Sequence, residues 1–259
     1  MTVEIGVTGA TGRMGREVVA AVRDREGCEV AFAINREPDG VTVDGTTVEP
    51  AGKIDTLLEE REPDAVVDFT GPASALEYAR ACAEAETDAP VGFVTGTTGF
   101  SDEAFADLEA ASESIPLLHA PNFARGVQAL VNVVGQAVRN LPGYDVELVE
   151  THHNGKRDAP SGTANRLLSE IEANGEFTGR NHGREGEEPR EEREIGVHAL
   201  RAGTITGEHE VVLAGNDEEL RLTHRAEDRG VFAAGAVDAA TWIAGRKAGR
   251  YEFADVIDE

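Results

Sequence analysis

Short apolar runs alternate with helix-like segments along the first half of the chain. Strand-like runs cover residues 3–7, 29–34, 65–69, 91–94 and 115–119, and apolar residues at helical spacing lie around residues 18–22, 54–60, 73–85 and 102–112. Segment 37–53, rich in proline, glycine and threonine, predicts a polar loop or a short hairpin. Strands that alternate with helices in this way predict an α/β, Rossmann-like fold with a doubly wound parallel sheet.

The pattern changes after about residue 124. A helix over 127–140, a strand over 146–151 and a helix starting near Gly162 are followed by segments that predict antiparallel strands, at 197–200, 204–213 and 220–224. We therefore expect residues 124–228 to form a second, α+β domain with a mixed or antiparallel sheet. An alanine-rich helix over 231–248 is expected to return to the first domain, which then comprises residues 1–123 with 229–259. Segment 176–194 is charged and has no apolar periodicity, and we interpret it as a mobile loop whose only expected roles are subunit contact or lid closure.

Three glycines, Gly9, Gly12 and Gly15, lie between the first predicted strand and the first predicted helix. Glycine permits a tight turn, lets the backbone approach a pyrophosphate and allows the helix to pack closely on the strand. Such turns also occur for purely structural reasons, but this position favours a dinucleotide site. Ligands of open parallel sheets bind outside the carboxyl ends of the strands, so residues 96–98, which follow another predicted strand, are expected beside the same cofactor.

Asn35 and Arg36 end the second predicted strand, where folds of this type discriminate between nicotinamide cofactors. An acidic residue there would bind the ribose hydroxyls of NADH, whereas a neutral residue followed by arginine suits the 2′-phosphate of NADPH. The pair therefore favours NADPH. If Arg36 instead faces solvent, both cofactors are tolerated.

Residues 147–164 contain the candidate chemistry of the second domain. The first turn of a helix presents backbone N–H groups and the positive end of the helix dipole. The amides near Gly162 and Thr163 are therefore candidates for binding a carboxylate or phosphate oxygen. Lys156 lies in the same stretch and is one of only three lysines, whereas arginine is common in the chain. A lysine in this position indicates a residue that releases a proton or places a compact positive charge, which arginine cannot do. The alternative is a lysine without a function in a solvated loop.

Two adjacent histidines, His152 and His153, precede this lysine. Imidazole exchanges protons near neutral pH, so the pair favours an acid/base or anion-binding role over that of an exposed structural pair. Consecutive residues of a strand point to opposite faces, and no cysteine or third histidine lies at a ligand-like spacing. We therefore expect no metal site.

The chain of 259 residues carries a net charge of −25, from 49 acidic and 24 basic residues. This acidity argues against binding nucleic acid or an anionic membrane. Salt screens such self-repulsion, which favours a halophilic protein, with an acidic protein of an ordinary cytosol as the alternative. No apolar run reaches membrane-spanning length and no signal-like segment is recognised, so we expect a cytoplasmic protein in which Cys28 and Cys82 stay reduced.

With these pieces in place, the chain resembles the dihydrodipicolinate reductases, also called 4-hydroxy-tetrahydrodipicolinate reductases, over essentially its full length. The most specific motif is HHNGKRDAPSGTA at residues 152–164, and the others are GRMG at 12–15, VDFT at 67–70, GTTGF at 96–100, APNF at 120–123, RAG at 201–203 and GEH at 207–209. The resemblance implies reduction of 4-hydroxy-tetrahydrodipicolinate in the diaminopimelate route to lysine. It also implies a homotetramer whose second domain binds the small dicarboxylate substrate and forms the subunit contacts.

The resemblance also assigns roles to individual residues. In this family the residues matching His152 and Lys156 are the proposed proton donors, and which of the two donates stays open. The residue matching His153 contacts the substrate, and those matching Gly162 and Thr163 hold a substrate carboxylate. The cofactor, NADPH or NADH, would contact Gly9, Ala10, Thr11, Gly12, Arg13, Met14, Gly96, Thr97, Thr98, Ala120, Pro121, Asn122 and Phe123. Asn35 replaces an acid that some members use to contact the adenosine ribose, which argues against a strong preference for NADH.

Two other functions share parts of this pattern. A semialdehyde dehydrogenase has a similar nucleotide domain but needs a nucleophilic cysteine at the carboxyl end of a strand, whereas Cys28 lies before a strand and Cys82 in a predicted helix. A non-catalytic NADPH sensor would need the first domain but has no reason to keep histidines and a lysine beside a helix start. Hydride transfer to the cyclic substrate, followed through the absorbance of NADPH, distinguishes the three functions.

Overall fold

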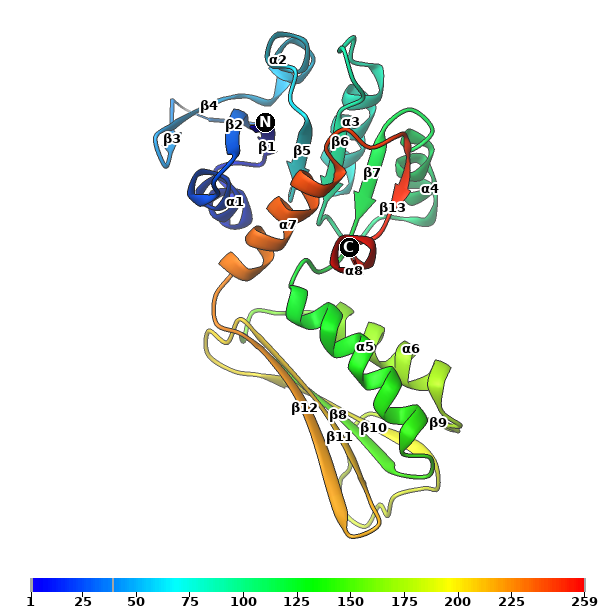
Figure 1. Cartoon of the computed structure of the whole chain (residues 1–259). Helices are drawn as coiled ribbons and strands as arrows, with labels where there is room; N and C mark the ends of the chain where they lie inside the picture. Colours follow the sequence, from blue (N-terminus) through cyan, green and yellow to red (C-terminus); the bar gives the residue numbers. More distant parts are fainter. Residues whose placement is uncertain (1, 39, 259) are drawn as a thin grey trace. The chain divides into compact units, whose positions relative to one another are not determined.

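The computed structural model describes residues 2–38 and 40–258 and divides into two compact units. Unit 1 comprises residues 1–123 with 229–259, and unit 2 comprises residues 124–228. Each unit has its own sheet (Figure 1). Each unit also has its own hydrophobic core. In the described part of the chain, no helix combines the length and the hydrophobicity needed to cross a lipid bilayer.

Unit 1 is built on an eight-stranded sheet with the strand order β13-β7-β6-β5-β1-β2-β4-β3. Its strands are β1 (Val3–Thr8), β2 (Cys28–Asn35), β3 (Thr42–Val43), β4 (Thr46–Pro50), β5 (Ala65–Asp68), β6 (Gly92–Thr95), β7 (Pro116–His119) and β13 (Gly249–Tyr251). Neighbouring strands are parallel except for the antiparallel hairpin of β3 and β4. β5 and β6 are buried at every position, as expected of strands covered by helices on both faces. The doubly wound parallel sheet predicted from the sequence is confirmed.

Helices cover both faces of this sheet. α1 (Arg13–Asp24) and α7 (Gly230–Ile243) pack together in one core, which also contains the short α8 (Phe253–Asp258). α2 (Ile54–Arg61), preceded by the single turn η1 (Ala51–Lys53), shares the other core with α3 (Pro72–Glu84) and α4 (Asp102–Ala111). The carboxyl ends of β1 and β5, between which the strand order reverses, are the position where such sheets bind ligands.

The chain returns to unit 1 through α7, as predicted. Alanines on this helix let it lie close to α1, β5 and β6. The predicted length, 231–248, is wrong at the carboxyl end. The helix stops at Ile243 because Gly245 adopts a left-handed conformation, with φ +71°. The pattern did not predict β13 or α8, which follow it and which are only three and six residues long.

Unit 2 contains a five-stranded mixed sheet with the order β12-β11-β8-β10-β9. Its strands are β8 (Asp145–His152), β9 (Gly179–Asn181), β10 (Glu194–Arg201), β11 (Gly207–Gly215) and β12 (Glu218–Ala226). α5 (Arg125–Asn140) and α6 (Gly162–Asn174) pack on one face of this sheet (Figure 1). The prediction of antiparallel strands is correct for β11 and β12 but wrong for β10, which runs parallel to β8. The reason is α6, which carries the chain back between β8 and β10 as the crossover of a parallel pair.

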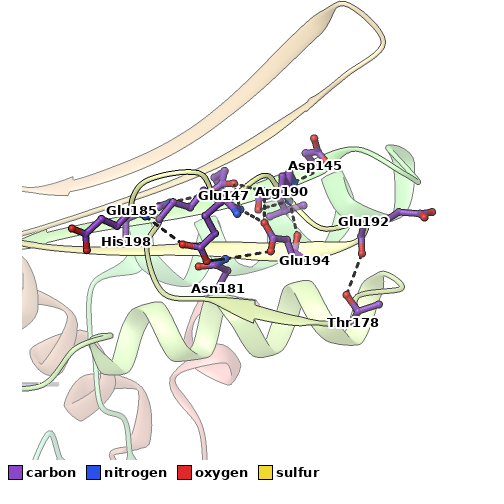
Figure 2. A network of polar contacts seen from close by, with 12 residues as sticks. Asp145, Glu147, Thr178, Asn181, Glu185, Arg190, Glu192, Glu194 and His198 are labelled. Atoms are coloured by element: carbon purple, nitrogen blue, oxygen red, sulfur yellow. Dashed lines mark hydrogen bonds and ion pairs between the residues drawn. The ribbon is translucent and has the colours of Figure 1, made fainter.

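Segment 176–194, predicted as a loop, contains β9 and is attached to the sheet by ion pairs (Figure 2). Arg184 and Arg190 each pair with Glu147 of β8 and with Glu194 of β10. Glu194 is buried and also accepts a hydrogen bond from the side-chain amide of Asn181, at 3.4 Å. The sequence pattern missed this arrangement because ion pairs between separated segments leave no apolar periodicity.

Candidate active site

Helix α6 begins directly after a buried serine. Ser161 is the N-cap of α6, and its Oγ accepts a hydrogen bond from the backbone N–H of Ala164 at 3.1 Å. The backbone N–H of Ser161 donates to Oε1 of Glu150 on β8, also at 3.1 Å. The first turn of α6, which contains Gly162 and Thr163, is therefore held against the end of β8.

Glu150 is at the centre of this arrangement, and its side chain is fully buried. Arg201 of β10 donates to both carboxylate oxygens, at 2.9 Å to Oε2 and 2.7 Å to Oε1. Nδ1 of His152 lies 2.5 Å from Oε2. Burial raises the pKa of Glu150, but the hydrogen bonds from Arg201 and His152 outweigh burial and hold the pKa below its ordinary value. The carboxylate is thus ionised at neutral pH although it is inaccessible to water.

His152 is the last residue of β8, and 12% of its side chain is exposed. The ring packs against Gly207 of β11, where a Cβ atom would lie 3.1 Å from Nε2. Burial lowers the pKa of His152, and the carboxylate of Glu150 opposes this effect. One ring nitrogen is therefore bound to Glu150, and glycine at position 207 leaves room beside the other.

A second histidine, His209 of β11, packs edge-on against His152, with the ring centroids 5.2 Å apart. His209 is buried, and its Nε2 lies 3.0 Å from Oγ of Ser161. Burial lowers the pKa of His209 to about 3, and the neighbouring His152 acts in the same direction. His209 is therefore neutral at ordinary pH, and its Nδ1 has no hydrogen-bond partner within the described residues.

Lys156 lies in the turn that follows β8. Its Nζ is 2.9 Å from Oδ1 of Asp158, and 22% of its side chain is exposed. Its backbone N–H donates to the carbonyl of His153 at 3.1 Å. The charge of Lys156 contributes to lowering the pKa of His152, so the two groups are close enough to interact. Unit 2 therefore gathers both predicted proton donors at the carboxyl end of β8.

The glycine turn of unit 1 brings two backbone segments into contact. Gly9 has φ +63°, which favours glycine, and its carbonyl accepts a hydrogen bond from the N–H of Gly12 at 2.8 Å. A Cβ atom at Gly15 would lie 2.1 Å from the Gly9 carbonyl oxygen, so α1 can start this close to β1 only with glycine there. The turn therefore fits the pyrophosphate of a dinucleotide at the start of α1.

A cavity of about 520 Å³ opens beside this turn. It is lined, among others, by Gly9, Gly12, Asn35, Arg36, Thr70 and Ser74. Arg36 is exposed at this cavity, and its Nη2 lies 3.4 Å from Oγ of Ser74. The guanidinium is therefore accessible to a phosphate group bound in the cavity.

Asp68 ties together the carboxyl ends of three parallel strands of unit 1. Its buried carboxylate accepts hydrogen bonds from the hydroxyl groups of four threonines, Thr8, Thr70, Thr95 and Thr97, at 2.7, 2.6, 2.7 and 2.8 Å. Its backbone carbonyl accepts from the N–H of Gly96 at 2.9 Å. Asp68 therefore holds the segment with Gly96, Thr97 and Thr98, which is predicted to lie beside the cofactor, through its hydrogen bonds with Gly96 and Thr97.

The remaining predicted cofactor residues differ in their accessibility. Arg13, Thr98 and Pro121 are exposed, whereas Ala10, Ala120 and Phe123 are buried. Phe123 packs edge-on against Phe69 and Phe253, with ring centroids 5.7 and 5.2 Å away. Its ring belongs to the core, so Phe123 would meet a cofactor through its backbone.

Family models for dihydrodipicolinate reductase match nearly the whole chain, the N-terminal model at residues 3–123 and the C-terminal model at residues 126–257. The chain belongs to the dihydrodipicolinate reductase family. A 4-hydroxy-tetrahydrodipicolinate reductase from Natronomonas pharaonis is 53% identical over 252 residues, which cover 97% of this chain and 98% of that protein. A protein of the same name from Haloarcula marismortui is 52% identical over 254 residues, 98% of each chain. The resemblance inferred from the motifs is confirmed.

A solved structure shows the same fold. Dipicolinate-bound dihydrodipicolinate reductase from Paenisporosarcina sp. TG-14 superposes with a TM-score of 0.78 at 24% identity, over 97% of this chain and 98% of that one. Membership in the dihydrodipicolinate reductase family, together with the Rossmann-like unit 1, implies a nicotinamide cofactor.

Three residues of this candidate site, Glu150, Arg201 and His209, were not singled out by the sequence. Strand pairing places them together: Glu150 lies beside His209 across β8 and β11, and Arg201 lies beside His152 across β8 and β10. The available signals were the RAG and GEH motifs and a glutamate at an inward-facing position of an apolar strand. Neither signal shows by itself that the three side chains meet.

Proposed function

We propose that this chain reduces 4-hydroxy-tetrahydrodipicolinate to tetrahydrodipicolinate with NADPH or NADH, in the diaminopimelate route to lysine. The observation that carries the proposal is the cluster at the carboxyl end of β8, where His152 and Lys156 lie near the start of α6. The proteins of this name that match over their whole length support the same reaction. Unit 1 is then the dinucleotide-binding domain, and unit 2 is the substrate-binding and oligomerisation domain.

The proposed substrate is a doubly charged acid, which an acidic protein has to attract by local positive charge. We assign its carboxylates to His153, Lys156 and the first turn of α6 at Gly162 and Thr163. The ammonium group and the positive end of the helix dipole both stabilise a carboxylate there. Glu150 does not repel the substrate strongly, because Arg201 neutralises it inside the protein.

The reaction needs a hydride and a proton. A reduced nicotinamide, when bound, supplies the hydride to C4 of the cyclic, unsaturated dicarboxylate that forms when the substrate loses its hydroxyl group as water. His152 or Lys156 then donates a proton to the carbanionic carbon, and the positive groups stabilise the developing negative charge. A positioned donor of this kind typically contributes about 10²-fold or more to the rate.

We assign cofactor binding to three loops of unit 1. These are the glycine turn at Gly9, Ala10, Thr11, Gly12, Arg13 and Met14, the loop after β6 at Gly96, Thr97 and Thr98, and the loop after β7 at Ala120, Pro121, Asn122 and Phe123. Asn35 and Arg36 favour NADPH in this proposal. An exposed guanidinium at the cavity suits a 2′-phosphate, and the neutral Asn35 does not repel it.

We further propose a homotetramer that works in the cytoplasm, where reduced nicotinamide cofactors are available. Its contacts would involve the face of the unit 2 sheet opposite α5 and α6. Leu200 on that face is 47% exposed. Cross-strand ion pairs lie on the same face, Arg221 with Glu210 and Arg225 with Glu208. A face with an exposed leucine and both signs of charge can be complementary to a second copy of itself.

The experiment is a steady-state assay with synthesised 4-hydroxy-tetrahydrodipicolinate and either reduced cofactor, followed through cofactor absorbance. The substrate should cause oxidation of NADPH or NADH, and His152→Gln and Lys156→Ala should each lower kcat by about 10²-fold or more. Failure to oxidise either cofactor would show that the proposed function is wrong. A semialdehyde dehydrogenase would instead reduce the oxidised cofactor when given a semialdehyde, but Cys82 is buried and burial raises the pKa of its thiol, which makes it a poor nucleophile.

A further inference from the structure

We propose that Glu150 is a positioning residue for the reduction: it holds His152 in one orientation and one tautomer, with a proton on Nδ1 and with Nε2 as the atom that exchanges a proton with the substrate. The inference rests on the proposed function, because it assigns His152 a part in the reaction. Glu150 itself is too deeply buried to touch the substrate.

The hydrogen bonds around Glu150 determine which nitrogen of His152 carries the proton. An ionised carboxylate accepts hydrogen bonds and donates none. Arg201 donates two N–H groups and Ser161 donates its backbone N–H, and these bonds keep the buried carboxylate ionised. The 2.5 Å contact between Oε2 and Nδ1 of His152 is therefore donated by the imidazole. Nδ1 carries the proton in both the neutral and the charged form of the ring.

Nε2 is then the nitrogen that changes its protonation state. In the neutral ring it has a lone pair, and in the imidazolium it has the N–H that can be given to a carbanion. Gly207 lies next to this atom, and a larger residue there would crowd it, since a Cβ would lie 3.1 Å from Nε2. The carboxylate of Glu150 also fixes the plane of the ring, in the way that an aspartate orients the histidine of a catalytic triad.

The groups around His152 and its neighbour His209 come from four strands and one loop. Glu150 precedes it on β8, Arg201 lies on β10, Lys156 follows in the loop, His209 packs from β11, and His224 of β12 lies beside His209. Burial disfavours a positive charge on the ring, and so do the charges of Lys156 and Arg201. His209 is neutral. Glu150 is thus the one group of this set that favours the imidazolium.

The first measurement uses the unaltered enzyme and requires no turnover. In protein labelled with ¹⁵N-histidine, two-dimensional NMR shows which ring nitrogen of each neutral histidine carries the proton, and the signals of His152 are identified by their loss in His152→Gln. We expect Nδ1–H for His152. A neutral His152 with its proton on Nε2 would overturn the proposal.

The second measurement uses Glu150→Gln, which keeps the shape of the side chain and removes its charge. The amide of glutamine can donate to Nδ1, so the neutral ring should change to the Nε2–H tautomer and its pKa should decrease. Because the imidazolium is the proton donor in this proposal, kcat should decrease by about 10²-fold or more at neutral pH, and the decrease of kcat with rising pH should begin at a lower pH than in the wild type. Glu150→Asp, which restores the charge, should restore the Nδ1–H tautomer and part of the rate.

A matched control lies on the opposite face of the same strand. Oε2 of Glu147 lies 2.7 Å from Nε2 of His198, a second glutamate–histidine pair that faces away from α6 (Figure 2). Glu147→Gln should leave kcat within a few-fold of wild type and should leave the Nδ1–H tautomer of His152 unchanged. An unchanged His152 tautomer in Glu150→Gln would overturn the proposal. If the tautomer changes but the pH dependence of kcat does not, Glu150 orients His152 but the proton comes from Lys156. The assignment of proton exchange to Nε2 of His152 is then overturned, while the proposed reduction itself stands.

Discussion

Nε2 of His209 lies 3.0 Å from Oγ of Ser161, the residue that caps α6. Burial is the main reason why the pKa of His209 decreases from an ordinary 6.5 to about 3, so this histidine is neutral in the folded protein. In the unfolded chain the same side chain binds a proton below pH 6.5. Protonation therefore favours the unfolded state, and stability that is complete above pH 6.5 is lost as the pH decreases towards 3.

His209→Gln should reduce this pH dependence, because glutamine can keep a hydrogen bond to Ser161 without taking up a proton. One proton that is bound by the unfolded state but not by the folded state changes the free energy of unfolding by about 1.4 kcal/mol per pH unit. Urea unfolding at several pH values between 4 and 7 should give a flatter curve for the variant. His182→Gln changes an exposed histidine and should keep the wild-type slope. Parallel curves for His209→Gln and the wild type would show that His209 takes up a proton as readily in the folded protein as in the unfolded chain, which would contradict the lowered pKa.

Lys156→Arg separates the two roles of this residue. Arginine keeps the positive charge but does not release its proton near neutral pH. If Lys156 only binds a carboxylate, kcat should stay within about tenfold of wild type and KM should change more. If it donates the proton, kcat should decrease about 10²-fold or more. Lys53→Arg is the control, because Lys53 pairs with Glu49 on the surface of unit 1 and should affect neither constant.

Arg36→Ala should weaken the use of NADPH while leaving the use of NADH nearly unchanged. A hydrogen bond to a charged group contributes about 1.5–3 kcal/mol, which corresponds to an increase in KM for NADPH of about tenfold or more. Steady-state rates with both cofactors give the two KM values. Arg80→Ala removes an exposed ion pair with Asp107 and should leave them unaltered. An equal increase in both KM values would contradict a role of Arg36 at the 2′-phosphate.

Arg190→Met should destabilise unit 2 more than Arg193→Met, although both change an arginine of the same segment. Arg190 pairs with Glu147 and donates to the backbone carbonyls of Val146 and Glu194, at 3.2 and 2.5 Å. Arg184 still pairs with Glu147 and Glu194 in the variant, so the cost is that of the lost charge-assisted hydrogen bonds, about 1.5–3 kcal/mol. Arg193 pairs with Glu176 at the surface, where 53% and 86% of the two side chains are exposed, and should contribute less than about 1 kcal/mol. Equal unfolding midpoints for the two variants would show that the ion pairs in Figure 2 contribute little.

Salt should stabilise this protein. Its net charge of −25 makes the folded state repel itself, and salt screens this repulsion. The halophilic archaeal relatives are consistent with a function at high salt. The unfolding temperature should increase between low and molar KCl. A midpoint that does not change over this range would contradict the halophilic interpretation.

Much of unit 1 could be predicted because local patterns carry the information. β5 and β6 are buried at every position and so read as short continuous apolar runs, and α1 shows one apolar face at helical spacing. The start of α6 was equally visible, because Ser161 is a typical N-cap residue directly before Gly162. The direction of β10 was not visible, because parallel and antiparallel neighbours can have the same apolar pattern.

The amino-acid sequence by itself determined the alternating strands and helices of unit 1, the glycine turn, the candidate residues at 152–164 and membership in a reductase family. Only the tertiary structure decided that Arg201 neutralises Glu150, 51 residues away, and that both lie beside His152 and Ser161. The physical reason is that periodicity and capping depend on neighbours along the chain. A buried charge finds its partner through the register of β8 with β10 and β11, which many residues set together.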